Sequence, residues 1–98
     1  MFIILLTYTC LTEKIDEYLV EHRTYLDRYY SCNKFICSGA QQPRTGGVIL
    51  CNGVSVDEVE SIVLEDPFKI HNLATYQVIE FTPSKFAPAF ESFIQKGE

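Results

Sequence analysis

Short apolar runs alternate along this chain with stretches in which apolar residues recur every three or four positions. Residues 2–9 (FIILLTYT) are rich in β-branched and large apolar side chains, which predicts a strand. Apolar and aromatic positions then recur at helical spacing through residues 12–30, and Thr12 suits the N-cap of that helix. Residues 34–40 and 47–52 predict two more strands, joined by a loop that contains a proline and a glycine.

The second half of the chain predicts another helix and strand, followed by a tail. A capping box at residues 55–58 (SVDE) predicts a helix that ends near residue 65, because its Ser and Glu can bond each other's backbone amides. An Asp-Pro step then begins a short turn or helix over residues 66–71, and residues 74–82 predict a fourth strand. A C-terminal helix is predicted to begin at Ser84 or Pro88.

The predicted order is β-α-β-β-α-β with a C-terminal helix, in a single domain over residues 1–98. Short connections and right-handed crossovers favour a ferredoxin-like α+β fold with helices on one face of the sheet. The strands at residues 2–6 and 48–51 do not alternate between apolar and polar residues, as strands with one solvated face should. We therefore expect the second sheet face to pack against the same face of another subunit, in a homodimer.

Composition narrows the classes of function. The 98 residues suit one domain, and a hydrophobic content of 47% argues against disorder. A net charge of −5 with eight Lys and Arg residues argues against nucleic-acid binding. The four cysteines have no C-x-x-C pair and no zinc-like spacing, so we expect no metal site and free thiols. The apolar run at residues 2–6 lacks a basic flank and is short for a signal peptide, so we expect a cytoplasmic protein without membrane contact.

His22 and Asp66 are the two residues that suggest proton-transfer chemistry. His22 lies on the apolar stripe of the first predicted helix, and histidine is the side chain that most often serves as a general acid or base. Asp66 precedes Pro67, so it suits an N-cap, and its carboxylate would also orient an imidazole. One carboxylate oxygen can cap while the other faces the ring. The alternative is a core-edge histidine bonded to a carbonyl and an aspartate that only caps.

Three further residues are candidates for ligand binding. Ser38 and Gly39 lie in the second predicted strand, where a glycine marks a bulge or a close backbone approach that a ligand can use. Arg44, in the loop that follows, is a candidate for gripping an anionic substrate, or is simply solvated. Glu21 and Arg23 are interpreted as solvated charges on the first helix.

Several motifs together resemble those of the YciI-like (YCII-related) domain family from residue 2 to about residue 93. They are His22-Arg-x-Tyr-Leu26, the Ser-Gly pair in the second strand, the RTGG loop, Asp66-Pro-Phe68 and the closing I-E-F strand. The histidine and the DPF tripeptide are the most specific of these marks.

The resemblance implies a ferredoxin-like protomer in a dimeric α+β barrel with a His–Asp site in a cleft. Those roles would fall on His22 and Asp66, with Ser38 and Gly39 beside them. It also implies cofactor-free chemistry, because one characterised relative is a dehydrochlorinase of a hydroxylated aromatic ring. This chain has Leu19 where many members carry an Arg three residues before the histidine.

Two hypotheses of function follow from the sequence. The first is cofactor-independent acid/base catalysis by His22 and Asp66, of lyase, isomerase or dehydrohalogenase type, on a small cyclic or aromatic compound. The alternative is a ligand-binding or accessory dimerisation domain without turnover. His71 and Tyr76 are weaker candidates for either site.

Overall fold

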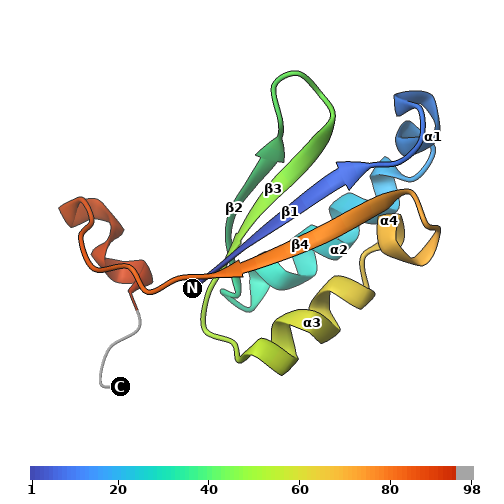
Figure 1. Ribbon diagram of the computed structural model, residues 1–98. Coiled ribbons are helices and arrows are strands. Elements are labelled where there is room, and N and C mark those ends of the chain that lie inside the picture. The colour runs from blue at the N-terminus through green and yellow to red at the C-terminus, as the bar shows by residue number, and fades with distance from the viewer. Residues whose placement is uncertain (95–98) are drawn as a thin grey trace.

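Four antiparallel strands form one sheet in the computed structural model, which describes residues 1–94 (Figure 1). The strands are β1 (Phe2–Tyr8), β2 (Phe35–Ala40), β3 (Gly46–Cys51) and β4 (Ala74–Glu80), in the order β2-β3-β1-β4. The helices are α1 (Thr12–Asp16), α2 (Leu19–Ser31), α3 (Val56–Leu64), α4 (Pro67–Ile70) and the 3₁₀-helix η1 (Pro88–Phe93). Helices α2 and α3 lie on one side of the sheet, so the predicted ferredoxin-like α+β fold is confirmed (Figure 1).

The hydrophobic core lies between the sheet and these helices, on what we call the covered face. On the central strand β1, Phe2, Ile4 and Leu6 are buried there, since side chains alternate between the two faces of a strand. Helices α2 and α4 each contribute a buried aromatic ring, Tyr25 and Phe68. The core therefore fixes the position of α2 and α4, which carry the two residues predicted to act together.

The predicted helix over residues 12–30 is interrupted in the structure. Helix α1 ends at Asp16 and α2 begins at Leu19, because Tyr18 leaves the helical region with φ −114° and ψ 11°. The Tyr18 ring stacks on His71 at 4.1 Å, which ties this break to the end of α4. The predicted Thr12 cap is wrong: Leu11 occupies the N-cap position and Thr12 is the first residue of α1. The apolar spacing runs unchanged through the break, so it gave no sign of it.

The second half of the chain agrees more closely with prediction. The Ser55 half of the capping box is confirmed, since the Glu58 amide donates to Ser55 Oγ at 3.1 Å, and the Glu58 carboxylate pairs with Lys34. The tail begins at Pro88, one of the two predicted starts, and forms a 3₁₀-helix that stands away from the sheet (Figure 1).

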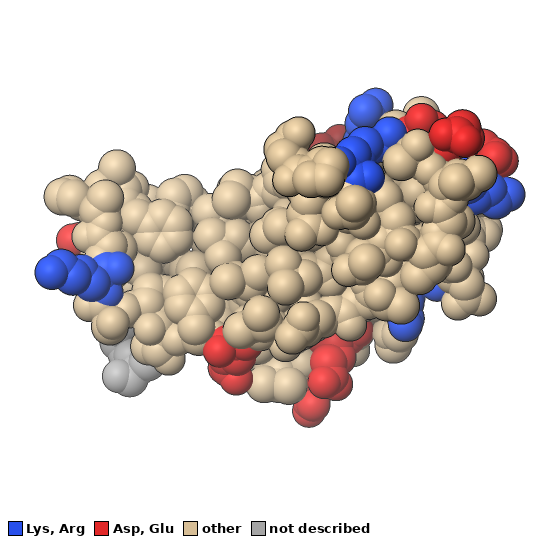
Figure 2. All heavy atoms as spheres, turned by 45° about the horizontal axis from the view of Figure 1, so that its top comes forward, with Lys and Arg blue, Asp and Glu red and all other residues tan. Residues whose placement is uncertain are grey.

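The other side of the sheet, which we call the open face, is covered by no helix of residues 1–94 (Figure 1). The pairing register assigns eleven residues to it: Ile3, Leu5, Thr7, Cys37, Gly39, Gly46, Val48, Leu50, Thr75, Gln77 and Ile79. None of them is charged. Figure 2 shows a broad area without charged side chains over the middle of the molecule, with Lys, Arg, Asp and Glu gathered at its margins.

Within the same residues, no helix has the length and apolar character that a membrane crossing requires.

Candidate functional site

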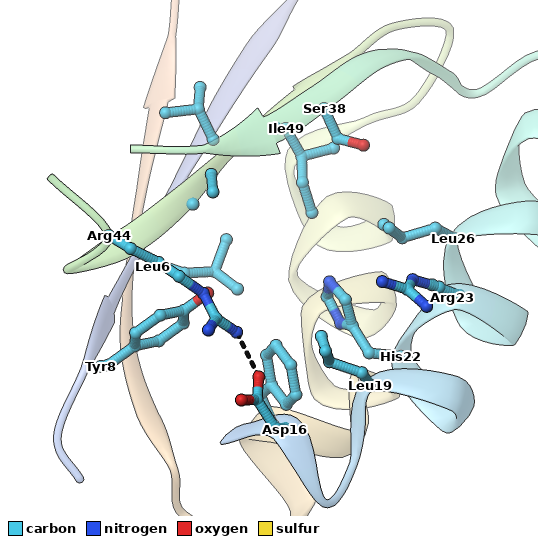
Figure 3. Close-up of a pocket in the computed structure, with 15 residues that line it drawn as sticks. Leu6, Tyr8, Asp16, Leu19, His22, Arg23, Leu26, Ser38, Arg44 and Ile49 are labelled. Carbon is cyan, nitrogen blue, oxygen red and sulfur yellow. Dashed lines mark hydrogen bonds and ion pairs between the residues drawn. The ribbon is translucent and has the colours of Figure 1, made fainter. Parts of the chain in front are cut away.

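A cavity of about 540 Å³ opens between α2 and the end of the sheet formed by β1, β2 and β3 (Figure 3). Its volume falls in the range of small-molecule sites in proteins. Much of its lining is apolar, from Leu6, Leu19, Leu26, Ile49 and Phe68. The charged and titratable side chains of the lining include Asp16, His22, Arg23 and Arg44. The cavity thus combines an apolar wall with a few polar groups, as small-molecule sites commonly do.

His22 and Asp66 meet at this cavity, although 44 residues separate them in the sequence. His22 Nδ1 lies 2.9 Å from Asp66 Oδ1; the histidine side chain is 13% exposed and the aspartate is fully buried. An ionised carboxylate only accepts hydrogen bonds, so in the neutral imidazole this contact places the ring hydrogen on Nδ1. Nε2 of the neutral ring then carries the lone pair that a general base requires.

The Phe68 ring packs flat against the His22 ring and fixes its orientation. The two rings stack with centroids 4.1 Å apart and an interplanar angle of 9°. Phe68 is itself buried, in α4 directly after Asp66 and Pro67. The Asp-Pro-Phe tripeptide therefore supplies both the carboxylate and the surface that orient the imidazole.

Asp66 also caps α4, since its Oδ1 accepts the Phe68 amide hydrogen at 3.0 Å, with Pro67 in the first turn. The sequence analysis expects one carboxylate oxygen to cap α4 and the other to face the imidazole. In the structure Oδ1 contacts both the Phe68 amide and the His22 ring, and Oδ2 contacts neither.

The Tyr76 hydroxyl on β4 is a candidate partner for that oxygen. The hydroxyl and Asp66 Oδ2 are both buried, and neither has a hydrogen-bond partner within residues 1–94. Burial first, and then the charge of Asp66, raise the pKa of Tyr76, so its hydroxyl stays protonated near the carboxylate. Sequence reasoning left Tyr76 as a weak candidate, because nothing in residues 74–82 shows which side chain lies behind Asp66.

Ser38, Gly39 and Arg44 all line the cavity. Ser38 Oγ lies 2.6 Å from the Tyr30 hydroxyl, so part of its bonding capacity is already used. The strand bulge falls between Phe35 and Cys37 rather than at Gly39, where an added Cβ would meet nothing within 4 Å. Gly39 therefore marks neither a bulge nor a close approach within this protomer.

Arg44 is committed to an ion pair. Its Nη2 lies 2.6 Å from Asp16 Oδ1, which connects the β2–β3 loop to the end of α1 beside the cavity (Figure 3). The contact with Asp16 raises the pKa of Arg44, so the guanidinium stays charged and its charge is already balanced.

Arg23 is the residue that sequence reasoning missed. It was interpreted as a solvated charge, and it is indeed exposed, but it also lines the cavity next to His22. The available signal was its spacing, four residues after Leu19 and three before Leu26, which places it on the same stripe of α2. His71, by contrast, does not line this cavity; it stacks on Tyr18.

The part of the chain that the structure describes contains no group of three or more His, Cys, Asp or Glu side chains placed to hold a metal ion. Its four cysteines are free thiols: Cys51 is buried, Cys10 is partly buried, and Cys32 and Cys37 are exposed.

Comparison with known proteins places this fold and site in a family. The family model of the YCII-related domain matches residues 1–82. The chain belongs to the YCII-related family. The match covers the sheet, α1 to α4 and the whole His22–Asp66 site of this YCII-related protein, and it ends before η1.

A comparison with curated proteins found no match. Among solved structures, the YCII-related chain is similar to 5-chloro-2-hydroxyhydroquinone dehydrochlorinase from Burkholderia phenoliruptrix AC1100, in complex with 2,5-dihydroxybenzoquinone. The TM-score is 0.71 and the identity 22%, over 82% of this chain and 91% of that chain. At this level of identity the likeness shows a shared fold.

Proposed function

We propose that this YCII-related protein is a cofactor-independent acid/base enzyme of lyase, isomerase or dehydrohalogenase type. The observation that carries the proposal is the contact of 2.9 Å between His22 Nδ1 and Asp66 Oδ1 beside the cavity. A buried carboxylate that fixes the tautomer of a partly exposed imidazole is the arrangement that general bases use.

The chemistry needs only groups that the chain supplies. His22 Nε2 takes a proton from a C–H or O–H group of the ligand, and the charge of Asp66 stabilises the imidazolium that forms. In an isomerisation the same proton returns to another atom of the ring. In a dehydrohalogenation the electron pair of the broken bond expels the halide, so the ligand loses one H⁺ and one halide ion. The proton then passes from His22 to water, which restores the base.

The shape and lining of the cavity support a small cyclic or aromatic substrate. Leu19 and Leu26 line one part of it and Leu6 and Ile49 another, so the cavity offers apolar surface from both helix and sheet. The similar structure mentioned above is that of an enzyme named for removing chlorine from a hydroxylated ring, which supports the same class of substrate.

The proposal includes a homodimer that pairs the open faces of two sheets. A two-fold interface brings equivalent residues of both copies close together, so a like charge on it would repel its own copy. The open face carries no charge, and its centre is apolar through Ile3, Leu5, Val48 and Leu50. No helix of residues 1–94 covers this uncharged, apolar face. A second copy of the chain is therefore the partner that matches it best.

Proton transfer can be tested with two compounds. Under nitrogen, we expect chloride release from 5-chloro-2-hydroxyhydroquinone, or deuterium uptake from D₂O at the ring carbons of 2,5-dihydroxybenzoquinone. His22→Asn should slow either reaction by about 10²–10⁴-fold, since it removes the base. His71→Asn is the matched control, because His71 lies outside the cavity and should leave the rate unchanged.

The outcome separates the two hypotheses of function. Binding of these ring compounds without chloride release or exchange would overturn the enzyme proposal and leave a ligand-binding dimer domain. A rate that His22→Asn does not change would remove His22 from the mechanism.

A further inference from the structure

The two arginines of the cavity differ in their partners. The charge of Arg44 is balanced by Asp16 at 2.6 Å. Arg23 forms no ion pair and no side-chain hydrogen bond with any residue in the described range 1–94. Asp66 is occupied by His22 and the α4 backbone, and Glu21, in the first turn of α2, does not line the cavity. The cavity therefore contains one permanent positive charge without a counter-ion from its own chain.

This charge lies beside the general base and against apolar surface. Arg23 follows His22 directly, and both residues line the cavity together with Leu19 and Leu26 of the same helix. Figure 3 shows the Arg23 side chain on the same side of the cavity as the His22 ring, whereas Arg44 reaches in from the opposite side. A ligand that fills this space meets apolar side chains on its ring and a guanidinium at one edge.

We propose that Arg23 is the anion-binding residue of the cavity and that its ligand is a ring compound bearing a carboxylate or an ionised ring hydroxyl. A guanidinium presents planar paired donors that match a carboxylate and also bind a single phenolate oxygen. The chain carries a net charge of −5, so an anion is repelled by the protein as a whole and needs a local positive group. As regards substrate class, this inference rests on the proposed function.

Arg23 would also act during the reaction. When His22 removes a proton from such a ring, negative charge grows on the ring and its oxygens. A guanidinium next to the base stabilises that charge more than it stabilises the ground state, and this difference accelerates a chemical step. Arg44 can stabilise that charge only after its ion pair with Asp16 is broken.

The test compares one anionic and one neutral ring of the same size. Isotope-labelled protein is titrated by NMR with benzoate and with benzyl alcohol at millimolar concentrations. We expect benzoate to bind about tenfold or more tightly, because a charge-assisted hydrogen bond favours it. Shifts should centre on Leu19, His22 and Leu26. Arg23→Gln should remove the preference, whereas Arg28→Gln should keep it, because Arg28 lies on the same helix but pairs with Glu65 outside the cavity.

Three outcomes would overturn this inference: equal affinities for both compounds, no binding of benzoate, or a benzoate preference that survives Arg23→Gln. His22→Asn separates the anion site from the proposed function, since it should abolish proton exchange and retain the benzoate preference. Suppose that the wild-type protein prefers benzoate but shows neither proton exchange nor chloride release. The anion site then stands and the enzyme proposal fails.

Discussion

The two faces of the sheet are made by alternating residues of the same strands and are both apolar at the centre, yet they differ in what covers them. The covered face is closely packed, with Phe2, Ile4 and Leu6 buried, and it faces the buried Asp66 and the cavity. The open face is apolar at its centre, uncharged and covered by no helix of residues 1–94.

This difference shows how a chain of 98 residues can hold a buried His–Asp pair within one small hydrophobic core. The covered face tolerates a buried charge because the Phe68 amide, His22 and Tyr76 surround the Asp66 carboxylate. The open face provides no such partners, and any charge there would face its own copy in the proposed dimer. The following predictions change one face at a time.

The largest effect is expected from a charge on the open face. Leu5→Lys places an ammonium on each copy at the centre of the proposed interface, so the wild-type dimer should become a folded monomer. Sedimentation at micromolar concentration should give twice the chain mass for wild type and the single chain mass for the variant. Leu64→Lys, on the exposed side of α3, is the control and should remain dimeric. A monomeric wild type would end the dimer proposal.

Neighbouring residues on β1 should respond differently to truncation. Ile4→Ala leaves a cavity in the covered face and should lower the free energy of unfolding by about 2–5 kcal/mol at any protein concentration. Ile3→Ala removes a partly exposed side chain, so its cost should depend on protein concentration, because it weakens the dimer rather than the protomer. Urea unfolding at two concentrations of each variant measures both effects. Equal, concentration-independent losses would contradict the proposed roles of the faces.

A smaller effect should come from the hydroxyl behind the buried charge. Tyr76→Phe removes a buried hydroxyl near the Asp66 carboxylate, which is the candidate donor to Oδ2, and should cost about 1–3 kcal/mol of stability. It should also broaden the His22 Nδ1–H proton resonance, because the carboxylate is less firmly held. Tyr25→Phe removes another buried hydroxyl, bonded to the Ile62 carbonyl at 2.9 Å, and should lower stability without changing that resonance. An unchanged resonance in Tyr76→Phe would separate Tyr76 from the pair.

The smallest effect is expected from chemical labelling of the cysteines, which requires no substitution on either face. Burial raises the pKa of Cys51 from 9.0 to about 11, so less thiolate is present at about pH 8 and alkylation should be roughly a hundredfold slower. Its rate should increase as pH approaches the higher pKa. Exposed Cys32 should react first, and Cys37, on the open face, should be protected at high protein concentration. Iodoacetamide labelling followed by peptide mass spectrometry gives all three rates. Rapid labelling of Cys37 at every concentration would count against the dimer.

The sequence predicted most of the fold because its signals are local. The apolar run at residues 2–9 and the Ser55–Glu58 capping box depend on neighbouring residues, and both appear in the structure close to their predicted bounds. The break at Tyr18 was not predicted, because it leaves the helical spacing of apolar residues intact and depends on a contact with His71. The tail was predicted to form a helix from Ser84 or Pro88, and the structure has a 3₁₀-helix from Pro88, with Phe86 before it and Phe93 at its end both exposed.

The candidate site was predictable only in part, for a related reason. His22 and Asp66 were singled out by residue type and by local context, and the structure brings them together. Tyr76 could not be chosen, because its role depends on the pairing of β4 with β1, which sets which β4 side chains point to the covered face. A helical projection places Arg23 on the same stripe of the helix as Leu19 and Leu26. Charged residues on a helix are usually solvated, so spacing alone did not identify Arg23 as a cavity residue.

The sharing of Asp66 Oδ1 between the Phe68 amide and the His22 ring bears on how this protein could change during evolution. A descendant without the proposed chemistry would still need the aspartate to begin α4, so selection for folding alone would retain it. The His22 side chain caps no helix in residues 1–94. Its loss would therefore mark the descendants that have abandoned the proposed proton transfer, while an intact Asp-Pro-Phe tripeptide would record only common ancestry and a stable turn.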